Sequence, residues 1–232
     1  MSSVLLLAYM SFSVVISVAA VIAMVRFAPV PRLEGTVAES RPFAGPLICL
    51  LIWLVVAVIL ALSGVYIRGT AGMPTIQFGI LLPIILGVAA YLAFPGIKRW
   101  VRSLPQSGLV GVQVYRVIGA IFIMLWAAGQ LPAVFALPAG LGDITVGLAA
   151  IFAARRGRNA ILWWNVLGIA DLVVALTTGF LTSPSRFQLF AFDAPNVLVG
   201  QFPLILIPTF LVPLSILLHL ASLVVLKADR QV

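Results

Sequence analysis

The chain has 232 residues, of which 63% are hydrophobic and only 9% are charged, and its formal net charge is +8. Soluble domains are typically about 25% charged, so the composition indicates an integral membrane protein without a separate soluble domain. The single cysteine, Cys49, excludes an intrachain disulfide and any site built from several cysteines. The basic residues are scattered over short segments, which argues against binding to nucleic acid.

Seven apolar runs are long enough to cross a bilayer, for which a helix needs about 20 residues. In chain order they are residues 3–25, 46–67, 75–94, 109–128, 132–154, 160–182 and 203–226. The first run is too long for a signal-peptide core and has no basic segment before it, so we expect it to remain as a membrane helix. The sequence therefore predicts one all-α transmembrane domain, residues 1–232, with seven helices.

Two connections have residue patterns suited to the membrane surface. Lys98, Arg99 and Arg102 surround Trp100, a pattern suited to an anionic membrane surface. Charge that sets the topology, beside an interfacial aromatic side chain, is the simpler interpretation of the same residues. Residues 182–202 mix aromatic and charged side chains, and we expect them to lie at the membrane interface.

The Lys and Arg residues between the runs alternate in number from one connection to the next. Eleven fall in the first, third and fifth connections and the C-terminal tail, whereas only Arg68 and Arg186 fall in the others. Cytoplasmic loops carry the excess of positive charge in membrane proteins. The sequence therefore predicts an N-terminus outside the cell and a cytoplasmic C-terminus, in a bacterial inner (plasma) membrane.

Runs 132–154 and 160–182 each carry one aspartate near the middle. Asp143 and Asp171 lie fourteen positions on either side of Gly157, within the basic connection that joins the two runs. In antiparallel helices both acids would lie roughly 18 Å from that turn, near the middle of the membrane. An ionisable side chain at this depth indicates a functional site.

Other polar residues fall in the same layer. Arg116 lies roughly 10 Å, and His219 roughly 12 Å, from the cytoplasmic end of their helices. With Asp143 and Asp171 they form the predicted substrate or proton site. Three secondary polar residues lie nearby: Gln113, Asn165 and Ser215.

Small residues flank each aspartate at helical spacing, which predicts close contact between the helices. Two ionised carboxylates repel each other in a medium of low dielectric constant, so one must bind a proton or a cation must lie between them. Arg116 is the natural cation. It could instead extend to the membrane surface, the aspartates could form a purely structural ion pair, and His219 could be a structural hydrogen-bonding partner.

The sequence names no cofactor and no metal. One histidine is too few for a protein-held zinc or for bis-histidine haem, and no lysine lies in mid-helix to hold retinal. No serine, cysteine or metal constellation identifies an enzymatic reaction.

Two classes of function remain. In the first, the aspartates and Arg116 form the site of a proton- or ion-coupled transporter or channel. In the second, the chain is an intramembrane enzyme or a subunit that binds lipid, quinone or pigment, its carboxylates serving as acid and base. The expected partners are membrane lipids, with a small ligand or other membrane subunits as alternatives.

Overall fold

The computed structural model describes residues 44–68 and 75–228, together with six separate positions between Leu5 and Ala19. In this part of the chain, six helical segments are long and apolar enough to cross a membrane. They are Gly45–Leu62, Ile76–Ala93, Gln106–Ala127, Ala133–Ala153, Arg158–Thr182 and Ile207–Ala228. The chain is therefore an all-α, polytopic membrane protein, as its composition predicts.

The first predicted run, residues 3–25, lies outside the described residues except at those six positions, where the backbone is helical. Tyr9 is one of these positions, and its side chain contacts a later part of the chain. The Tyr9 hydroxyl donates a hydrogen bond to the carbonyl oxygen of Ile118 over 3.4 Å. This contact places Tyr9 beside the segment Gln106–Ala127.

The predicted run 46–67 is divided into two helices in the structure. Helix α2 (Ala44–Leu62) ends just before Gly64, and the short helix α3 (Val65–Arg68) follows it. Gly64 has a φ of 70°, in the left-handed region that glycine adopts without steric cost. The single long helix predicted here is therefore wrong at its C-terminal end.

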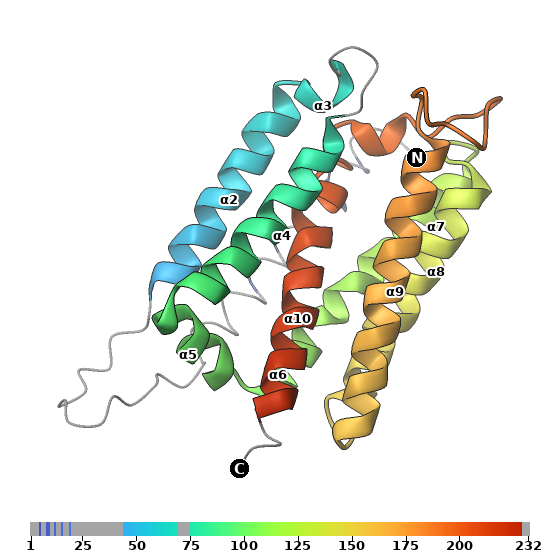
Figure 1. Cartoon of the computed structure of the whole chain (residues 1–232). Coiled ribbons are helices and arrows are strands. Elements are labelled where there is room, and N and C mark those ends of the chain that lie inside the picture. The colour runs from blue at the N-terminus through green and yellow to red at the C-terminus, as the bar shows by residue number, and fades with distance from the viewer. Residues whose placement is uncertain are drawn as a thin grey trace, which may run out of the picture.

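Helix α4 (Ile76–Ala93) matches the predicted run 75–94 closely and is followed at once by helix α5 (Pro95–Ser103). Proline is tolerated in the first turn of a helix, because its missing N–H would have no partner there. Helix α5 lies at one end of the bundle (Figure 1). It carries three basic residues, Lys98, Arg99 and Arg102.

The span Gln106–Ala127 has an irregular centre. Helix α6 (Gln106–Gly111) leads into a 3-10 segment, η1 (Val112–Gly119), and helix α7 (Ala120–Ala127) completes the span. The span begins at Gln106 rather than at the predicted residue 109. A 3-10 stretch in the middle of a helix often marks a functional hinge.

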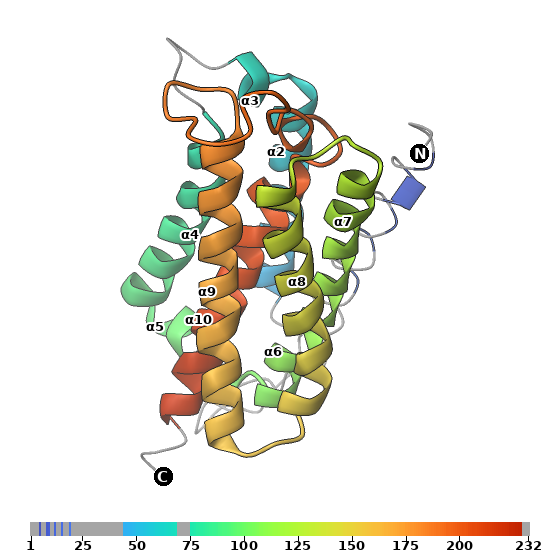
Figure 2. The same cartoon turned by 90° about the vertical axis from the view of Figure 1, so that its right-hand side faces the viewer.

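Helices α8 (Ala133–Ala153) and α9 (Arg158–Thr182) form the hairpin predicted from runs 132–154 and 160–182. They pack on each other, and α8 also packs on η1 and α7. Figure 2 shows the two helices side by side with the turn between them at one end. The hairpin therefore brings both aspartates close to η1.

The last span begins later than the predicted run 203–226. Residues 183–206 form turns and one 3-10 segment, η2 (Leu198–Gly200), before a π-helical turn, η3 (Ile207–Leu211), leads into helix α10 (Val212–Ala228). Proline has no N–H, so two prolines in and beside the π-helical turn remove α-helical hydrogen bonds. They are Pro208 and Pro213.

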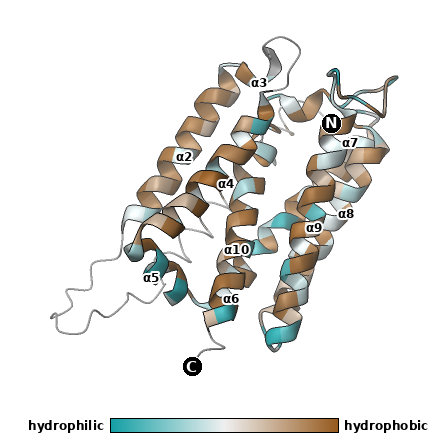
Figure 3. Cartoon of the chain, in the orientation of Figure 1, coloured by the Kyte–Doolittle hydropathy of each residue, from teal (hydrophilic) through white to brown (hydrophobic). Residues whose placement is uncertain are grey.

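Helix α10 is the central element of the bundle. It packs against α4, α5, α6 and α9, and 67% of its span is buried, compared with 6% of the span formed by α4. Helices α2 and α4 consist largely of hydrophobic residues (Figure 3), and many of their large hydrophobic side chains are exposed, as expected for helices that face lipid acyl chains. Polar side chains on α10 therefore lie inside the protein.

Most of the described cations at the ends of the spans lie at one end of the bundle. Helix α5, the α8–α9 turn and the C-terminal turn of α10 lie at one end, which we call the basic end (Figure 1). Its cations are Lys98, Arg99, Arg102, Arg155, Arg156, Arg158 and Lys227. At the opposite end, the segment after α9 carries Arg186 and Asp193.

Candidate functional site

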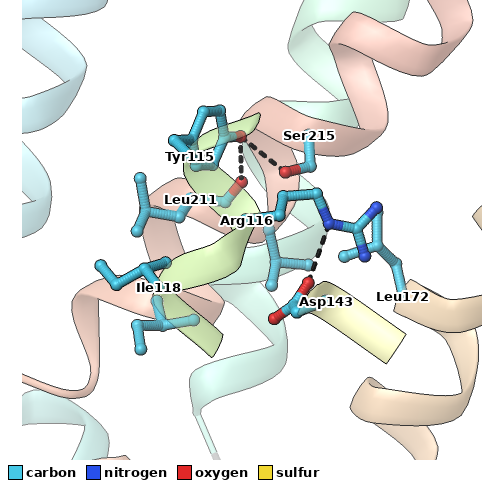
Figure 4. A pocket seen from close by; sticks show the side chains of 9 residues that line it. Tyr115, Arg116, Ile118, Asp143, Leu172, Leu211 and Ser215 are labelled. Carbon is cyan, nitrogen blue, oxygen red and sulfur yellow. Dashed lines mark hydrogen bonds and ion pairs between the residues drawn. The ribbon is translucent and has the colours of Figure 1, made fainter. Parts of the chain in front are cut away.

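Arg116 lies between the two aspartates in the centre of the bundle. Its side chain extends from η1 and is 2% exposed. Its Nε donates a hydrogen bond to Asp143 Oδ1 on α8 over 2.8 Å, and its Nη2 pairs with Asp171 Oδ2 on α9. One guanidinium is therefore shared by two carboxylates from neighbouring helices (Figure 4 shows the pair with Asp143).

The third guanidinium nitrogen of Arg116, Nη1, determines which ring nitrogen of His219 carries the proton. Nη1 donates to the Gly168 carbonyl oxygen over 3.4 Å and lies 3.2 Å from His219 Nε2. A guanidinium can only donate, so His219 Nε2 accepts and carries no proton. The proton of the neutral ring is therefore on Nδ1, which donates to Asn165 Oδ1 over 2.9 Å.

A row of amide side chains continues from His219 toward the basic end. Asn165 Nδ2 donates to Ser222 Oγ over 2.8 Å, and Gln106 Nε2 donates to the same oxygen over 2.6 Å. Gln106 is the first residue of α6, directly after α5 and its basic residues. We call His219, Asn165, Ser222 and Gln106 the amide branch.

A different set of polar groups lies on the other side of Arg116. The Tyr115 hydroxyl is 2.6 Å from Ser215 Oγ and donates to the Leu211 carbonyl oxygen over 3.3 Å. Gln113 Nε2 donates to the Ser215 carbonyl oxygen over 3.3 Å, while its Oε1 has no partner among the described residues. We call Tyr115 and Ser215 the hydroxyl pair.

A small cavity of about 10 Å³ lies between the 3-10 segment η1 and the π-helical turn η3. Its lining combines the hydroxyl pair, Arg116 and Asp143 with apolar side chains (Figure 4). The apolar residues are Ile118, Leu172, Ile207, Leu211 and Val212. The lining is mostly apolar, but a cavity of this size has room for about one water molecule, and the four polar side chains could bind it.

Glycines on neighbouring helices make room for the polar side chains. A Cβ placed on any one of three glycines would overlap an acid or the histidine. The pairs are Asp171 with Gly142, Asp143 with Gly119, and His219 with Gly168. The close approach of these helices therefore depends on the absence of a side chain at these positions.

The formal charges of the cluster do not sum to zero. Arg116 contributes one positive charge, His219 is neutral in the geometry described, and Asp143 and Asp171 contribute two negative charges when both are ionised. Isolated charge is costly in a buried, poorly polarisable environment. A proton on one carboxylate would bring the cluster to neutrality, so the arrangement is suited to binding and releasing one proton.

The structure brings the four predicted site residues into direct contact. Arg116 touches Asp143, Asp171 and His219 and does not extend to the membrane surface. The three secondary residues divide between the two sides, with Asn165 in the amide branch and Gln113 and Ser215 beside the cavity. Sequence reasoning missed Tyr115 and Gln106. The adjacency of Tyr115 to Arg116 was a usable signal for Tyr115, whereas Gln106 was assigned to a loop.

Among the described residues, no group of three or more His, Cys, Asp or Glu side chains could hold a metal ion.

Comparison with known protein families gives one match. A family model described as "Domain of unknown function (DUF8737)" matches residues 73–227. The matched region contains Arg116, both aspartates and His219, and it begins just before α4. Comparisons with curated proteins and with solved structures gave no significant match.

Proposed function

The chain belongs to the DUF8737 family, and we propose that it is a proton-coupled transporter or channel in which the Arg116 cluster binds the proton. The observation that carries the proposal is the sharing of one guanidinium by two largely buried carboxylates. Such a cluster is one proton short of neutrality, so proton binding changes its electrostatic energy strongly. Ionisable groups inside a membrane protein commonly mark proton or ion pathways.

Proton binding would change the partners of Arg116. When both aspartates are ionised, the guanidinium bridges α8 and α9. A proton on one carboxylate weakens the attraction of that carboxylate for Arg116, so the guanidinium then favours the other acid. The site would thereby change the contact between η1 and one helix of the hairpin.

Two irregular helical stretches beside the cluster support this mechanism. The 3-10 segment η1 carries Arg116, and the π-helical turn η3 precedes the polar face of α10. Irregular backbone at membrane depth is tolerated where it is buried in protein or lines a cavity, and interrupted helices commonly form ion sites in transporters. Both stretches line the cavity beside Asp143.

The positive charge at the basic end supports a cytoplasmic position for that end. The proposed orientation therefore places the α8–α9 turn and the C-terminus in the cytoplasm and the α7–α8 turn outside. The proposed location is a bacterial inner membrane, with lipids around α2 and α4. Further proposed partners are a small ligand or other membrane subunits.

Infrared difference spectroscopy tests the proton site directly. Raising the pH between about 5 and 9 should remove a protonated carboxyl band from the native protein, and the band should be absent in both Asp143→Asn and Asp171→Asn, because the pair titrates as a unit. Asp193→Asn is the matched control, since Asp193 is exposed and lies outside the spans. No band in the native protein would contradict the proton site.

Proton uptake into proteoliposomes tests the transport part. With a membrane potential imposed and a pH-sensitive dye inside, the native protein and Asp193→Asn should take up protons, and the two buried-site variants should not. A carboxyl band without proton movement would contradict transport. It would favour a structural ion pair or a subunit role in a larger complex.

A further inference from the structure

The two polar networks that meet at Arg116 have different chemistry. The amide branch consists of a neutral histidine, two carboxamides and one serine, and it runs toward the basic end. The hydroxyl pair lies on the opposite side, next to the cavity that Asp143 lines. Only groups that can both give and accept a proton can relay one, so the two sides are not equivalent.

The amide branch is unsuited to proton movement. A carboxamide nitrogen does not release a proton near neutral pH, so Asn165 and Gln106 can hold their hydrogen bonds but cannot pass protons along them. His219 is also constrained, because its Nε2 accepts from the Arg116 guanidinium. A proton arriving at Nε2 would face a cation 3.2 Å away. The amide branch therefore positions Arg116 and offers no route for protons on this side of the site.

The hydroxyl pair is suited to proton movement. Tyr115 and Ser215 are buried, and each hydroxyl can donate one hydrogen bond while it accepts another. The cavity between this pair and Asp143 has room for about one water. In the structure the Tyr115 hydroxyl donates its proton to the Leu211 carbonyl oxygen of the irregular η3 turn over 3.3 Å, so the hydroxyl must turn toward the cavity before it can donate to a water there.

We infer that protons reach and leave Asp143 through a water in this cavity and the Tyr115–Ser215 hydroxyl pair; the inference rests on the proposed proton site. The water gives one proton to the carboxylate and receives one from Tyr115, and Tyr115 receives one from Ser215. Ser215 is restored by a proton from the solvent side. Each hydroxyl gives one proton and gains one, so only Asp143 changes its protonation state.

Further hydroxyls lie beyond the pair, away from the basic end. Along α10 the chain runs toward the basic end, so Leu211 and Thr209 lie on the opposite side of Ser215 from His219. A Cβ placed on Gly79 would lie 2.8 Å from both the Thr209 methyl carbon Cγ2 and the Tyr66 hydroxyl oxygen, while the Thr209 hydroxyl donates to the Ile205 carbonyl oxygen over 2.7 Å. Burial raises the pKa of the Tyr66 phenol, so it remains a neutral hydroxyl. This placement assigns proton entry to the end opposite the basic end.

Hydrogen–deuterium exchange of the carboxyl band tests the route. After rapid transfer of the whole protein into D₂O, the band shifts as the buried carboxyl exchanges its proton, and its rate reports access to Asp143. Ser215→Ala and Tyr115→Phe should each slow the exchange about tenfold or more, which corresponds to a barrier higher by about 1.4 kcal/mol. Tyr115→Phe retains the ring, so it preserves the test if Ser215→Ala fails to fold.

Thr182→Val is the matched control, because it removes a buried hydroxyl whose hydrogen bonds stay within α9 and that belongs to neither polar network. Its exchange rate should stay close to that of the native protein. Equal rates in all three variants, or slowing by Thr182→Val alone, would overturn the route. A visible carboxyl band in the native protein would still support the proton site. Absence of the band from the native protein would overturn the proton site and the route together.

Discussion

Arg116 uses its nitrogen atoms to hold three neighbouring helices at one point. Nε binds α8, Nη2 binds α9, and Nη1 lies against the histidine of α10. A buried charge with this many partners is stable only while the partners are present. The energetics of the site should therefore be strongly non-additive.

Removing the arginine alone should be costly. We expect Arg116→Ala to lower the free energy of unfolding by about 3–5 kcal/mol, because it leaves two buried acids without a cation. The double variant with Asp143→Ala should lose less than the sum of the two single losses. Chemical denaturation in detergent measures the cycle, with Arg156→Ala at the exposed turn as the control. Additive losses would contradict the pairing.

The protonation of His219 can be checked at one atom. The chain contains a single histidine, so its ¹⁵N signals need no assignment by mutation. We expect the neutral ring with its proton on Nδ1 at pH 7, since Nε2 faces Arg116. In Arg116→Gln this preference should weaken. A doubly protonated ring in the native protein at pH 7 would be inconsistent with the hydrogen bonds described here.

At the scale of the elements, three glycines set the distances between helices around the site. The built Cβ of Gly142 would lie 2.5 Å from Asp171 Cγ, closer than any ordinary contact. The side chain of Asp171 would have to leave the guanidinium to accommodate a methyl group. The same helices would therefore pack without forming the second ion pair.

We expect Gly142→Ala to lower the free energy of unfolding by about 1–3 kcal/mol through overpacking and to alter the carboxyl band. Gly111→Ala is the matched control, because nothing lies within 4 Å of its built Cβ and its φ of −64° is helical. That variant should be neutral or slightly stabilising. Equal melting temperatures for the two variants would contradict the close packing at Gly142.

The helical hairpin was predictable from the sequence, and the clustered prolines of the last run were a signal for the irregular turn η3, whereas nothing in the sequence indicated the 3-10 geometry of η1. Apolar length and the equal spacing of the two aspartates about Gly157 predicted α8 and α9 well, because hydrophobicity determines which residues enter a membrane. The switch to 3-10 and π geometry leaves no mark in hydropathy. It depends on contacts between distant residues, such as the one from Tyr115 to Leu211. Helix α5 was not predicted, because the charged residues in this short amphipathic segment made it look like a connection between two spans.

At the scale of the molecule, the polar face of α10 accounts for much of the site. Ser215, His219 and Ser222 share one face of α10 by their helical spacing, and each is buried. The sequence placed these residues and Arg116 in one layer but could not indicate which hydrogen bonds they form. The division into an amide branch and a hydroxyl pair required the positions of α6 and η1 relative to α10.

Orientation in the membrane can be tested with two cysteines. In a Cys49→Ser background, Gln130→Cys at the exposed α7–α8 turn should react with a membrane-impermeant maleimide added to intact cells. Gly157→Cys at the α8–α9 turn should react only after permeabilisation, because the basic end is expected in the cytoplasm. The reverse pattern would overturn the proposed orientation and the assignment of proton entry to the outside.

The order of the spans along the chain also bears on how the protein is made. Arg116 leaves the ribosome before Asp143, its partner 27 residues later, and well before Asp171. A lone arginine at the centre of a helix disfavours insertion by about 2.5–3.5 kcal/mol on translocon scales. The short α7–α8 turn allows the arginine span and α8 to enter the bilayer together as a helical hairpin. A nascent chain that stops before α8 should therefore insert its arginine span poorly, so biogenesis depends on the same aspartate as the folded site.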